Sequence, residues 1–309
     1  MPTLKEFTFL SCNGKNNVFF VECVPDGEVR GVLQIAHGIA EHCKRYVPFM
    51  EFMASNGFVC VANDHLGHGR TAKDESEYCF FGEENGWDMV VEDMDRLRRL
   101  ESAKYPDVPY FLLGHSMGSF LTRTYIIKHP DVLKGVIISG TGQNPGVVVA
   151  AGKAMANMHC NKYGANHPDE QLDSMAFGGY NKKFDSVRTK FDWLTRDPAV
   201  VDAYIADPMC GMLASCGLMR DMMGGLQFIW KEENLQKMNK TMPVYFYSGD
   251  MDPVGDWGKG TKKVYERFID TGMQDVKLKL YPNGRHEMLN EINKEEVYND
   301  ILEWVNSKL

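Results

Sequence analysis

The stretch Tyr110–Phe120, YFLLGHSMGSF, changes character at its centre. Four apolar or aromatic residues precede Gly114, and a second apolar run with a helix-compatible composition begins at Phe120. Between them Ser116 fits the pattern G-x-S-x-G. Glycines on both sides leave room for a sharp turn from strand to helix, and such a turn would display the serine hydroxyl as a nucleophile. The alternative interpretation is a plain glycine-rich turn in which the serine is incidental.

The predicted position of Ser116 at the start of a helix suits nucleophilic catalysis. Backbone N–H groups and the helix dipole stabilise negative charge that develops near a helix N-terminus. The N–H of Met117 is therefore a candidate donor to an oxyanion. A second donor is expected in the loop after the strand-like run 31–38, where Gly38 gives backbone freedom and the N–H of Ile39 could point at a carbonyl oxygen.

Eight β-rich runs alternate with helix-like segments along most of the chain. The central runs are almost continuously apolar, which is typical of strands covered on both faces in a parallel sheet. The pattern predicts an α/β fold with a mostly parallel eight-stranded sheet and helices on both faces. The runs are EFTFLS (6–11), VFFVECV (18–24), GVLQIAHG (31–38), FVCVAND (58–64), YFLLGHS (110–116), GVIISG (135–140), PVYFYSGD (243–250) and VKLKLYP (276–282). The helix-like segments are 46–57, 87–106, 259–273 and 293–309.

Residues 141–241 interrupt this alternation. The stretch lacks convincing strands and contains the methionine-rich run MCGMLASCGLMRDMMGGLQFIW (209–230). We expect a helical cap inserted into a core formed by residues 1–140 and 242–309. Because methionine is flexible and fills irregular apolar surfaces, the run fits an ordinary subdomain core, and it equally fits a lid that presents an adaptable face to an apolar substrate.

A serine nucleophile needs a base, and the base needs an orienting carboxylate. Four histidines follow Ser116 in the chain, and three of them lie at a helix end or in the insertion. His286 instead follows the last predicted strand, in a loop of the kind where α/β active sites gather. The order serine, acid, histidine, which goes with this kind of turn, also favours His286 as the base.

The acid is expected after the preceding strand, in PVYFYSGDMDPVGDW (243–257). Asp252 lies a short loop beyond that strand, whereas Asp250 is closer to it and could make an Asx-type turn instead. Spacing leaves these two at near parity, with Asp256 behind them.

Composition excludes several other classes of function. The chain of 309 residues is 44% hydrophobic and carries a net charge of −8, so a sizeable core is available and nucleic acid is disfavoured as a partner. Eight cysteines occur without a C-x-x-C pair, and no apolar run approaches the roughly 20 residues of a membrane span. We therefore expect free thiols in the cytoplasm and no metal or cofactor. His65 and His68 more plausibly form a turn that packs against the catalytic loops than part of a metal site, which needs three or four ligands.

Taken jointly, six segments resemble the serine hydrolases of the α/β-hydrolase fold, in particular the monoacylglycerol lipase and lysophospholipase group. They span nearly the whole chain, whereas G-x-S-x-G alone is not specific. They are AHGIAEHCKRY (36–46), NDHLGHGRT (63–71), LLGHSMGS (112–119), FDWLTRDPAVVDAYIADPMC (191–210), MPVYFYSGDMDPVGD (242–256) and YPNGRHEMLNE (281–291).

The resemblance implies a complete catalytic set. In the family the acid falls three residues after the glycine of a Gly-x-x-Asp run, and here that places it at Asp252, three after Gly249. It also implies Ser116 and His286 as nucleophile and base. It further implies that Ile39 and Met117 are the oxyanion donors. It also implies that the insertion is a cap over an apolar acyl channel.

The expected activity is hydrolysis of a carboxylic ester with an apolar acyl chain, with long-chain monoglycerides or lysophospholipids as the first candidates. An esterase for short-chain or aromatic, feruloyl-type esters is the alternative. Peptide hydrolysis of the proline iminopeptidase kind would need cap carboxylates to hold a substrate amine, and Asp169, Glu170 and Asp173 keep it open. A catalytically inactive ligand-binding module is the remaining alternative. Transient contact of the cap with a membrane or micelle, and the oligomeric state, stay open.

Overall fold

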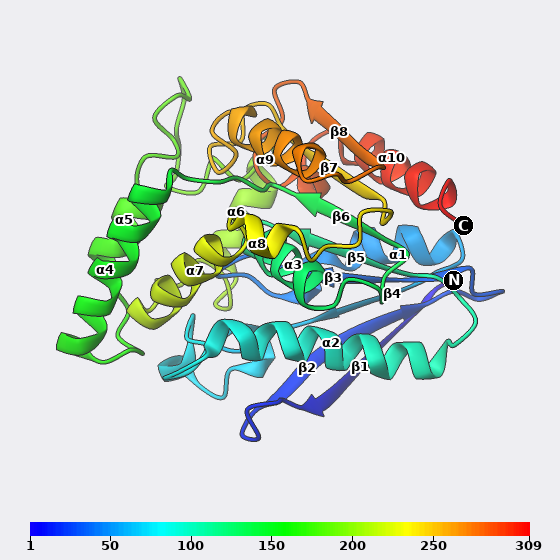
Figure 1. Cartoon of the computed structure of the whole chain (residues 1–309), viewed down its shortest axis with the longest axis horizontal. Helices are drawn as coiled ribbons and strands as arrows, with labels where there is room; N and C mark the ends of the chain where they lie inside the picture. The colour runs from blue at the N-terminus through cyan, green and yellow to red at the C-terminus, as the bar shows by residue number, and fades with distance from the viewer.

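The computed structural model describes all residues from 1 to 309 and contains one eight-stranded sheet (Figure 1). The strand order is β1-β2-β4-β3-β5-β6-β7-β8, with β2 antiparallel to both of its neighbours and the other neighbouring pairs parallel. The predicted mostly parallel eight-stranded sheet is therefore confirmed. The strands are Thr3–Leu10 (β1), Asn17–Val24 (β2), Gly31–Ala36 (β3), Phe58–Asn63 (β4), Tyr110–His115 (β5), Gly135–Ser139 (β6), Val244–Gly249 (β7) and Val276–Tyr281 (β8).

Ten α-helices and four short 3₁₀ helices connect or flank the strands. The α-helices are Val47–Ser55 (α1), Gly86–Lys104 (α2), Met117–Lys128 (α3), Gly146–Tyr163 (α4), Glu170–Phe177 (α5), Pro198–Ala206 (α6), Cys216–Phe228 (α7), Glu232–Leu235 (α8), Lys259–Asp270 (α9) and Lys294–Asn306 (α10). The 3₁₀ helices are Cys43–Tyr46, Gly69–Thr71, Glu75–Glu77 and Met288–Asn290.

Helices cover both faces of the sheet because the central strands are apolar on both faces. Along β5, Leu112 packs in one buried cluster with residues of α2, α3 and α9. Its neighbours Phe111 and Leu113 pack in a second cluster, with residues of α1 and α10. This alternation follows from the two-residue period of a strand, and it explains why the central runs contain few polar residues.

The chain order of the strands places a crevice at the ends of β3 and β5. From β3 the chain passes to β4 on one side, and it later returns as β5 on the other side, where Ala36 pairs with Gly114. The loops that leave two such strands diverge and open a crevice at their carboxyl ends, which is the usual ligand position in an open α/β sheet. Gly38 and Ile39 follow β3, and Ser116 follows β5.

The segment between β6 and β7 contributes no strand to the sheet. It holds α4 to α8, and its one isolated β-bridge joins Pro168 to Ser215. Figure 1 shows α4 and α5 at one end of the molecule, away from the strands. β6 ends at Ser139 and β7 begins at Val244, so both predicted boundaries of the insertion fall in loops. No helix combines the length and apolar character that crossing a bilayer requires.

Candidate active site

Ser116 occupies the turn between β5 and α3. Its backbone has φ 55° and ψ −122°, a conformation that a residue other than glycine adopts only under strain. The flanking glycines make the turn possible, because an added Cβ at Gly114 would lie 2.2 Å from Thr122 Oγ1, and one at Gly118 would lie 2.0 Å from the carbonyl oxygen of Ala36. The strain and the close packing are those expected of a displayed nucleophile rather than of an ordinary glycine turn.

The two predicted oxyanion donors lie on either side of Ser116. Met117 is the first residue of α3, and Ile39 follows β3; neither backbone N–H donates a hydrogen bond to another group of the protein. An added Cβ on Gly38 would stand 3.1 Å from Ser116 Cβ, so the loop that carries Ile39 lies directly against the serine. Both amides are thus free for a ligand beside the hydroxyl.

His286 and Asp252 meet through a direct hydrogen bond. The His286 Nδ1 and Asp252 Oδ1 atoms are 3.0 Å apart, and both side chains are buried. The Asp252 carboxylate also accepts hydrogen bonds from Ser248 Oγ at 2.8 Å and from the Val254 amide at 2.9 Å. With Nδ1 engaged, the other ring nitrogen of His286 is left for the substrate side, and His286 lines the same cavity as Ser116.

The other two acidic candidates take different positions. Asp250 accepts a hydrogen bond from the Asn283 amide at 2.7 Å, which ties the β7 loop to the β8 loop. Asp256 stands in a left-handed turn with φ 46°. Neither is hydrogen bonded to His286, so of the three aspartates the structure brings only Asp252 to the histidine.

His286 and Asp252 each shift the pKa of the other. Burial would lower the pKa of His286, but the charge and hydrogen bond of Asp252 oppose burial and raise that pKa above its ordinary value. Burial would raise the pKa of Asp252, but the interaction with His286 and the donors Ser248 and Val254 bring that pKa below its usual range. The pair therefore favours an ionised aspartate beside a histidine that readily accepts a proton.

Residues of the insertion pack against the His286 ring and its loop. The ring centroids of Trp193 and His286 are 5.0 Å apart, and the Glu287 amide donates to the Leu194 carbonyl oxygen at 2.7 Å. On its other side the His286 ring lies 4.6 Å from that of His115. Trp193 was not predicted from the sequence, although it belongs to a segment, 191–210, that carries the family resemblance.

Two cavities meet at Ser116. One of about 760 Å³ is lined by 29 residues, 18 of them hydrophobic, from α3, α4, α5, α7 and the loops after β6 and β7. The other, of about 280 Å³, has 12 polar residues or glycines among its 21 lining residues. Its charged residues are Glu41, Asp173, Lys190 and Glu287, besides His115 and His286. Ile39 and Ser116 line both, so a group held at the serine can extend into an apolar space and a polar space at once.

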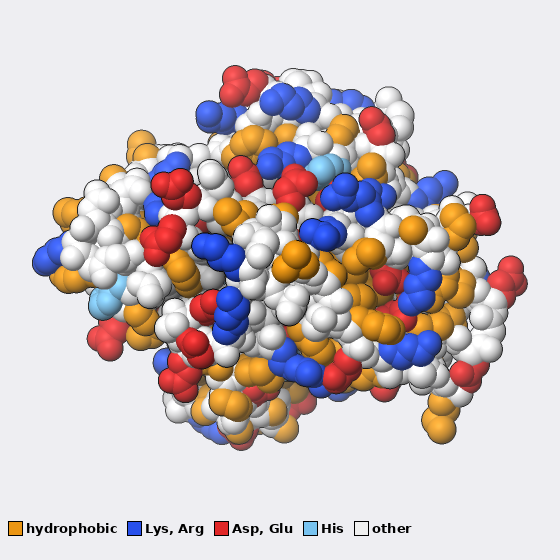
Figure 2. Space-filling view, turned by 90° about the horizontal axis from the view of Figure 1, so that it is seen from below, with side chains coloured by type: hydrophobic (Ala, Val, Ile, Leu, Met, Phe, Trp, Pro, Cys, Tyr) orange, Lys and Arg blue, Asp and Glu red, His pale blue; other side chains and the backbone are white.

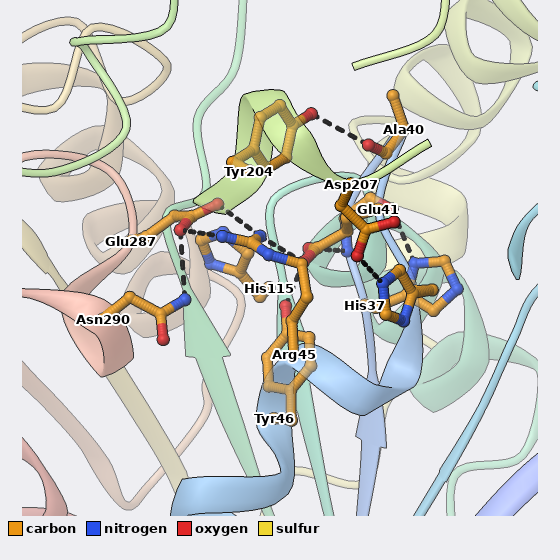
Figure 3. Close-up of polar contacts among 12 residues, drawn as sticks. His37, Ala40, Glu41, Arg45, Tyr46, His115, Tyr204, Asp207, Glu287 and Asn290 are labelled. Carbon is orange, nitrogen blue, oxygen red and sulfur yellow. Dashed lines mark hydrogen bonds and ion pairs between the residues drawn. The ribbon is translucent and has the colours of Figure 1, made fainter. Parts of the chain in front are cut away.

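A buried ion network borders the smaller cavity through Glu41 and Glu287 (Figure 3). Arg45 bridges the carboxylates of Glu41 and Glu287 with N–O distances of 2.7 Å. Burial would raise the pKa of Glu287, but Arg45 holds that pKa well below its ordinary value. Sequence reasoning missed this network; the only local signal was the i, i+4 spacing of Glu41 and Arg45.

Two groups of side chains could offer three ligands to a metal ion. One is Glu92, Asp95 and His129, on α2 and at the end of α3. The other is His42, Asp207 and Cys210, in which His42 Nε2 and Asp207 Oδ2 already pair at 2.8 Å. His65 and His68 belong to neither group, and their turn packs on the β3 loop through a hydrogen bond from the His65 amide to His37 Nε2 at 2.9 Å.

Comparison with known proteins connects this geometry to a family. Residues 27–293 match the family model described as "Serine aminopeptidase, S33". The chain is 30% identical to a monoacylglycerol lipase of Mycolicibacterium smegmatis, over 99% of both chains. It is 26% identical to the monoglyceride lipase of Mus musculus, over 92% of this chain and 83% of that protein. A highly thermostable carboxyl esterase from Bacillus coagulans, solved in complex with glycerol, superposes with a TM-score of 0.92 at 30% identity, covering 99% of this chain and 98% of that one.

The chain belongs to this α/β-hydrolase family. The predicted fold and the expectation of a hydrolase are thereby confirmed. The family match covers the loops that carry Ile39, Ser116, Asp252 and His286, together with the whole insertion. Of these four residues, Ile39, Ser116 and His286 line one cavity, and Asp252 is hydrogen bonded to His286.

Proposed function

We propose that this protein is a serine ester hydrolase that cleaves monoacylglycerols, with Ser116 as nucleophile, His286 as base and Asp252 as the orienting acid. The observation that carries the proposal is the buried hydrogen bond between His286 and Asp252 beside a strained Ser116, at the junction of an apolar and a polar cavity. The named lipase and esterase relatives support it.

The proposed reaction has two half-reactions. Ser116 Oγ attacks the ester carbonyl carbon while the free ring nitrogen of His286 takes the hydroxyl proton, and the Ile39 and Met117 amides receive the oxyanion. Each such donor contributes about 3 kcal/mol in comparable hydrolases. The C–O bond breaks, and His286 returns the proton to the departing alcohol. Water, deprotonated by His286, then attacks the acyl-serine, and the fatty acid leaves as Ser116 regains its proton.

The larger cavity suits the acyl chain. Its lining includes Phe120, Leu172, Met219 and Met222, and its volume of about 760 Å³ lies within the usual range for a ligand of drug size or larger. Methionine side chains adapt to a flexible alkyl chain better than branched ones do. Apolar burial then favours a long acyl chain by about 0.8 kcal/mol for each methylene that leaves water.

The smaller cavity suits a neutral polyol better than a phosphodiester. Glu41, Asp173 and Glu287 place carboxylates in its wall, and Lys190 is the one lysine or arginine among the lining residues. A phosphate there would face mostly like charge, which is costly in a partly buried site. A glycerol can instead donate hydroxyl hydrogen bonds to carboxylates. This favours monoacylglycerol over lysophospholipid.

Peptide hydrolysis is a second candidate because the matched family description names an aminopeptidase and because Asp173 lines the smaller cavity. A substrate ammonium would need that carboxylate to be free. The charge of Lys190 acts on Asp173 and opposes the rise in its pKa caused by burial, so Lys190 competes for it. Asp169 is a helix cap that pairs with His159, and Glu170 is exposed. These placements favour the ester.

We also propose that the cap touches a lipid surface. Val147 and Val148 on α4 and Met175 on α5 are more than half exposed, and the last two also line the acyl cavity. Figure 2 shows hydrophobic side chains at the end of the molecule that α4 and α5 form, among charged side chains of both signs that also cover the rest of that face. All eight cysteines are unpaired, which fits the expected cytoplasmic location.

One experiment tests the activity and the nucleophile together. Wild-type protein is expected to release fatty acid from a long-chain monoacylglycerol, and a fluorophosphonate is expected to modify Ser116, located by peptide mass. Ser116→Ala should keep its melting temperature and lose nearly all hydrolysis. Ser55→Ala, at an exposed serine on α1 whose hydroxyl donates to the Glu51 carbonyl oxygen, is the control. The panel includes lysophospholipid, p-nitrophenyl acetate, methyl ferulate and proline p-nitroanilide. Faster turnover of lysophospholipid, methyl ferulate or proline p-nitroanilide than of monoacylglycerol would refute the substrate, and modification elsewhere would refute the nucleophile.

A further inference from the structure

Arg45 is almost completely enclosed, yet it contacts two carboxylates at once. Its side chain is 11% exposed, and those of Glu41 and Glu287 are each 4% exposed. One guanidinium nitrogen, Nη1, donates to both glutamates, and Nη2 donates to Glu287, each at 2.7 Å (Figure 3). A buried arginine with a bidentate carboxylate is held in a fixed orientation, because both groups are planar and their donors and acceptors match.

Glu41 holds the loop that carries Ile39, the first proposed oxyanion donor. Glu41 Oε1 accepts hydrogen bonds from the Gly38 amide at 2.6 Å and from Tyr46 Oη at 2.8 Å, while Oε2 faces Arg45. Gly38 immediately precedes Ile39. An added Cβ on Gly38 would lie 2.7 Å from Glu41 Oε1, so this loop has no room to move toward the carboxylate. The position of the Ile39 amide therefore depends on where Glu41 stands.

Glu287 holds the loop that carries His286, the proposed base. Glu287 follows His286 directly, and its side chain accepts two hydrogen bonds from Arg45 and one from Asn290 Nδ2 at 3.0 Å. Its backbone amide donates to the carbonyl oxygen of Leu194 in the insertion at 2.7 Å. Both the side chain and the main chain of the residue next to the base are thus fixed.

The insertion contacts the same guanidinium. The Tyr204 ring on α6 lies 4.8 Å from Arg45 Cζ, and Tyr204 Oη donates to the Ala40 carbonyl oxygen at 2.8 Å. Figure 3 shows Glu287 on one side of Arg45 and Glu41 on the other, with Tyr204 above them. Arg45 is therefore a contact point for three segments that are remote in sequence: the oxyanion loop, the loop of His286 and the cap.

We propose that Arg45 is a positioning residue that couples the Ile39 oxyanion donor to His286 through Glu41 and Glu287, so that both sides of the reacting carbonyl are set by one buried cation. The inference rests on the proposed function, because it concerns residues of that reaction. It goes further by assigning a role to the side chains of Arg45, Glu41 and Glu287, which take no direct part in that reaction. Both carboxylates of this buried ion pair are attached to loops of the proposed reaction: Glu41 accepts the Gly38 amide next to Ile39, and Glu287 follows His286 directly.

The charges of the network also act on His286. Its charged or titratable neighbours are Asp252 after β7, His115 at the end of β5, Glu41 and Arg45 after β3, and Glu287 on its own loop. Negative charge raises the pKa of His286, and both Glu41 and Glu287 contribute in that direction. Removing a carboxylate should thus lower the pKa of the base.

Three variants test the proposal: Arg45→Lys, Arg45→Met and Glu287→Gln. The readouts are the rate of fluorophosphonate modification of Ser116, kcat and KM for p-nitrophenyl butyrate, and the acidic limb of the profile of kcat/KM against pH. We expect kcat and the modification rate to fall about 10- to 100-fold in Arg45→Met, with KM nearly unchanged, because small displacements of reacting groups cost that much. Arg45→Lys should recover part of the loss. The acidic limb should move to lower pH in Glu287→Gln.

Glu22→Gln is the control. Glu22 is also buried, it pairs with Lys104 at the end of α2, and it lies on β2, three places from β5 in the sheet. This variant should leave every readout at the wild-type value. Folded variants of Arg45 and Glu287 that keep wild-type rates and an unshifted limb would overturn the positioning role, and if Arg45→Met does not fold, Arg45→Lys and Glu287→Gln decide alone. A wild-type protein that neither cleaves esters nor reacts at Ser116 would instead remove the proposed function and this role with it.

Discussion

An added Cβ on Gly118 would stand 2.0 Å from the carbonyl oxygen of Ala36, so helix α3 starts in direct backbone contact with the end of strand β3. This contact brings the helix that begins after Ser116 against the loop that carries Ile39. The second glycine of the G-x-S-x-G pattern is therefore needed for packing as well as for the turn.

Gly118→Ala should consequently destabilise the protein by about 3 kcal/mol or more, because the obstructing atoms are backbone and cannot rotate away. Urea unfolding followed by circular dichroism measures the change. Gly146→Ala is the matched control, since a Cβ there meets no atom within 4 Å, at the start of α4. Equal stability of the two variants would contradict the contact.

The choice between two neighbouring aspartates gives a second prediction. Asp252→Asn should lower kcat by on the order of 10⁴-fold, because the amide cannot hold the His286 imidazole in the required tautomer or stabilise the imidazolium. Asp250→Asn should stay near wild type, since Asp250 only accepts the Asn283 amide. Hydrolysis of p-nitrophenyl butyrate measures both. The assignment of the acid fails if Asp250→Asn is the more damaging of the two.

These two aspartates show what the sequence could and could not settle. Strand β7 was recognisable because it is apolar on both faces, and this placed the acid in the following loop. Within that loop the spacing left Asp250 and Asp252 near parity, because side-chain direction in a tight turn depends on dihedral angles that residue types do not specify. The family resemblance favoured Asp252, and the structure brings that residue to His286.

Arg45 marks the limit of what local patterns can predict. Its partner Glu287 is 242 positions away in the chain, and no periodicity links residues across so long a separation. The strands and helices around it were predictable because their apolar periods are local. Contacts among charged loop residues depend on how those elements come together, and they become visible only in the folded structure.

The pKa of His286 gives a third prediction, on pH. Because the base must be neutral to accept the serine proton and Asp252 raises its pKa, kcat/KM should rise with pH around a midpoint above the ordinary value of about 6.5. The contribution of the His286–Asp252 pair to the stability of the fold should change with pH in the opposite direction to the rate. Its contribution is full between about pH 4 and pH 6.5, the unfolded values of the two groups, and is lost as pH rises through the folded pKa of His286. Rate profiles and melting temperatures over the same buffers measure the two trends, and a midpoint below the ordinary value would contradict the prediction.

Lipid contact by the cap gives a fourth prediction. Val147→Asp should slow hydrolysis of monoacylglycerol in vesicles several-fold without affecting soluble p-nitrophenyl butyrate, because a charge on an exposed apolar surface opposes insertion into the lipid interface. Val147 is 79% exposed on α4. Ile269→Asp on α9 is the control, with 44% exposure on a helix outside the insertion. Vesicle flotation with each variant reads binding directly, and equal binding of both would exclude the cap as the contact surface.

The apolar cavity gives the last prediction, on acyl length. Gly152 lies on α4 and lines this cavity, where an added Cβ would meet only the side chain of Met223, at 3.5 Å. Gly152→Phe should therefore fill space without disturbing the backbone, and glycine replacement in a helix favours the folded state. We expect kcat/KM for p-nitrophenyl palmitate to fall at least about 10-fold, since a few displaced methylenes are worth more than 1.4 kcal/mol, while the acetate ester is unaffected. Met158→Phe, on the same helix but outside the cavity lining, should leave the rates for both substrates unchanged. If Gly152→Phe instead slows both esters equally, the acyl chain binds elsewhere, and the smaller cavity becomes the one to test.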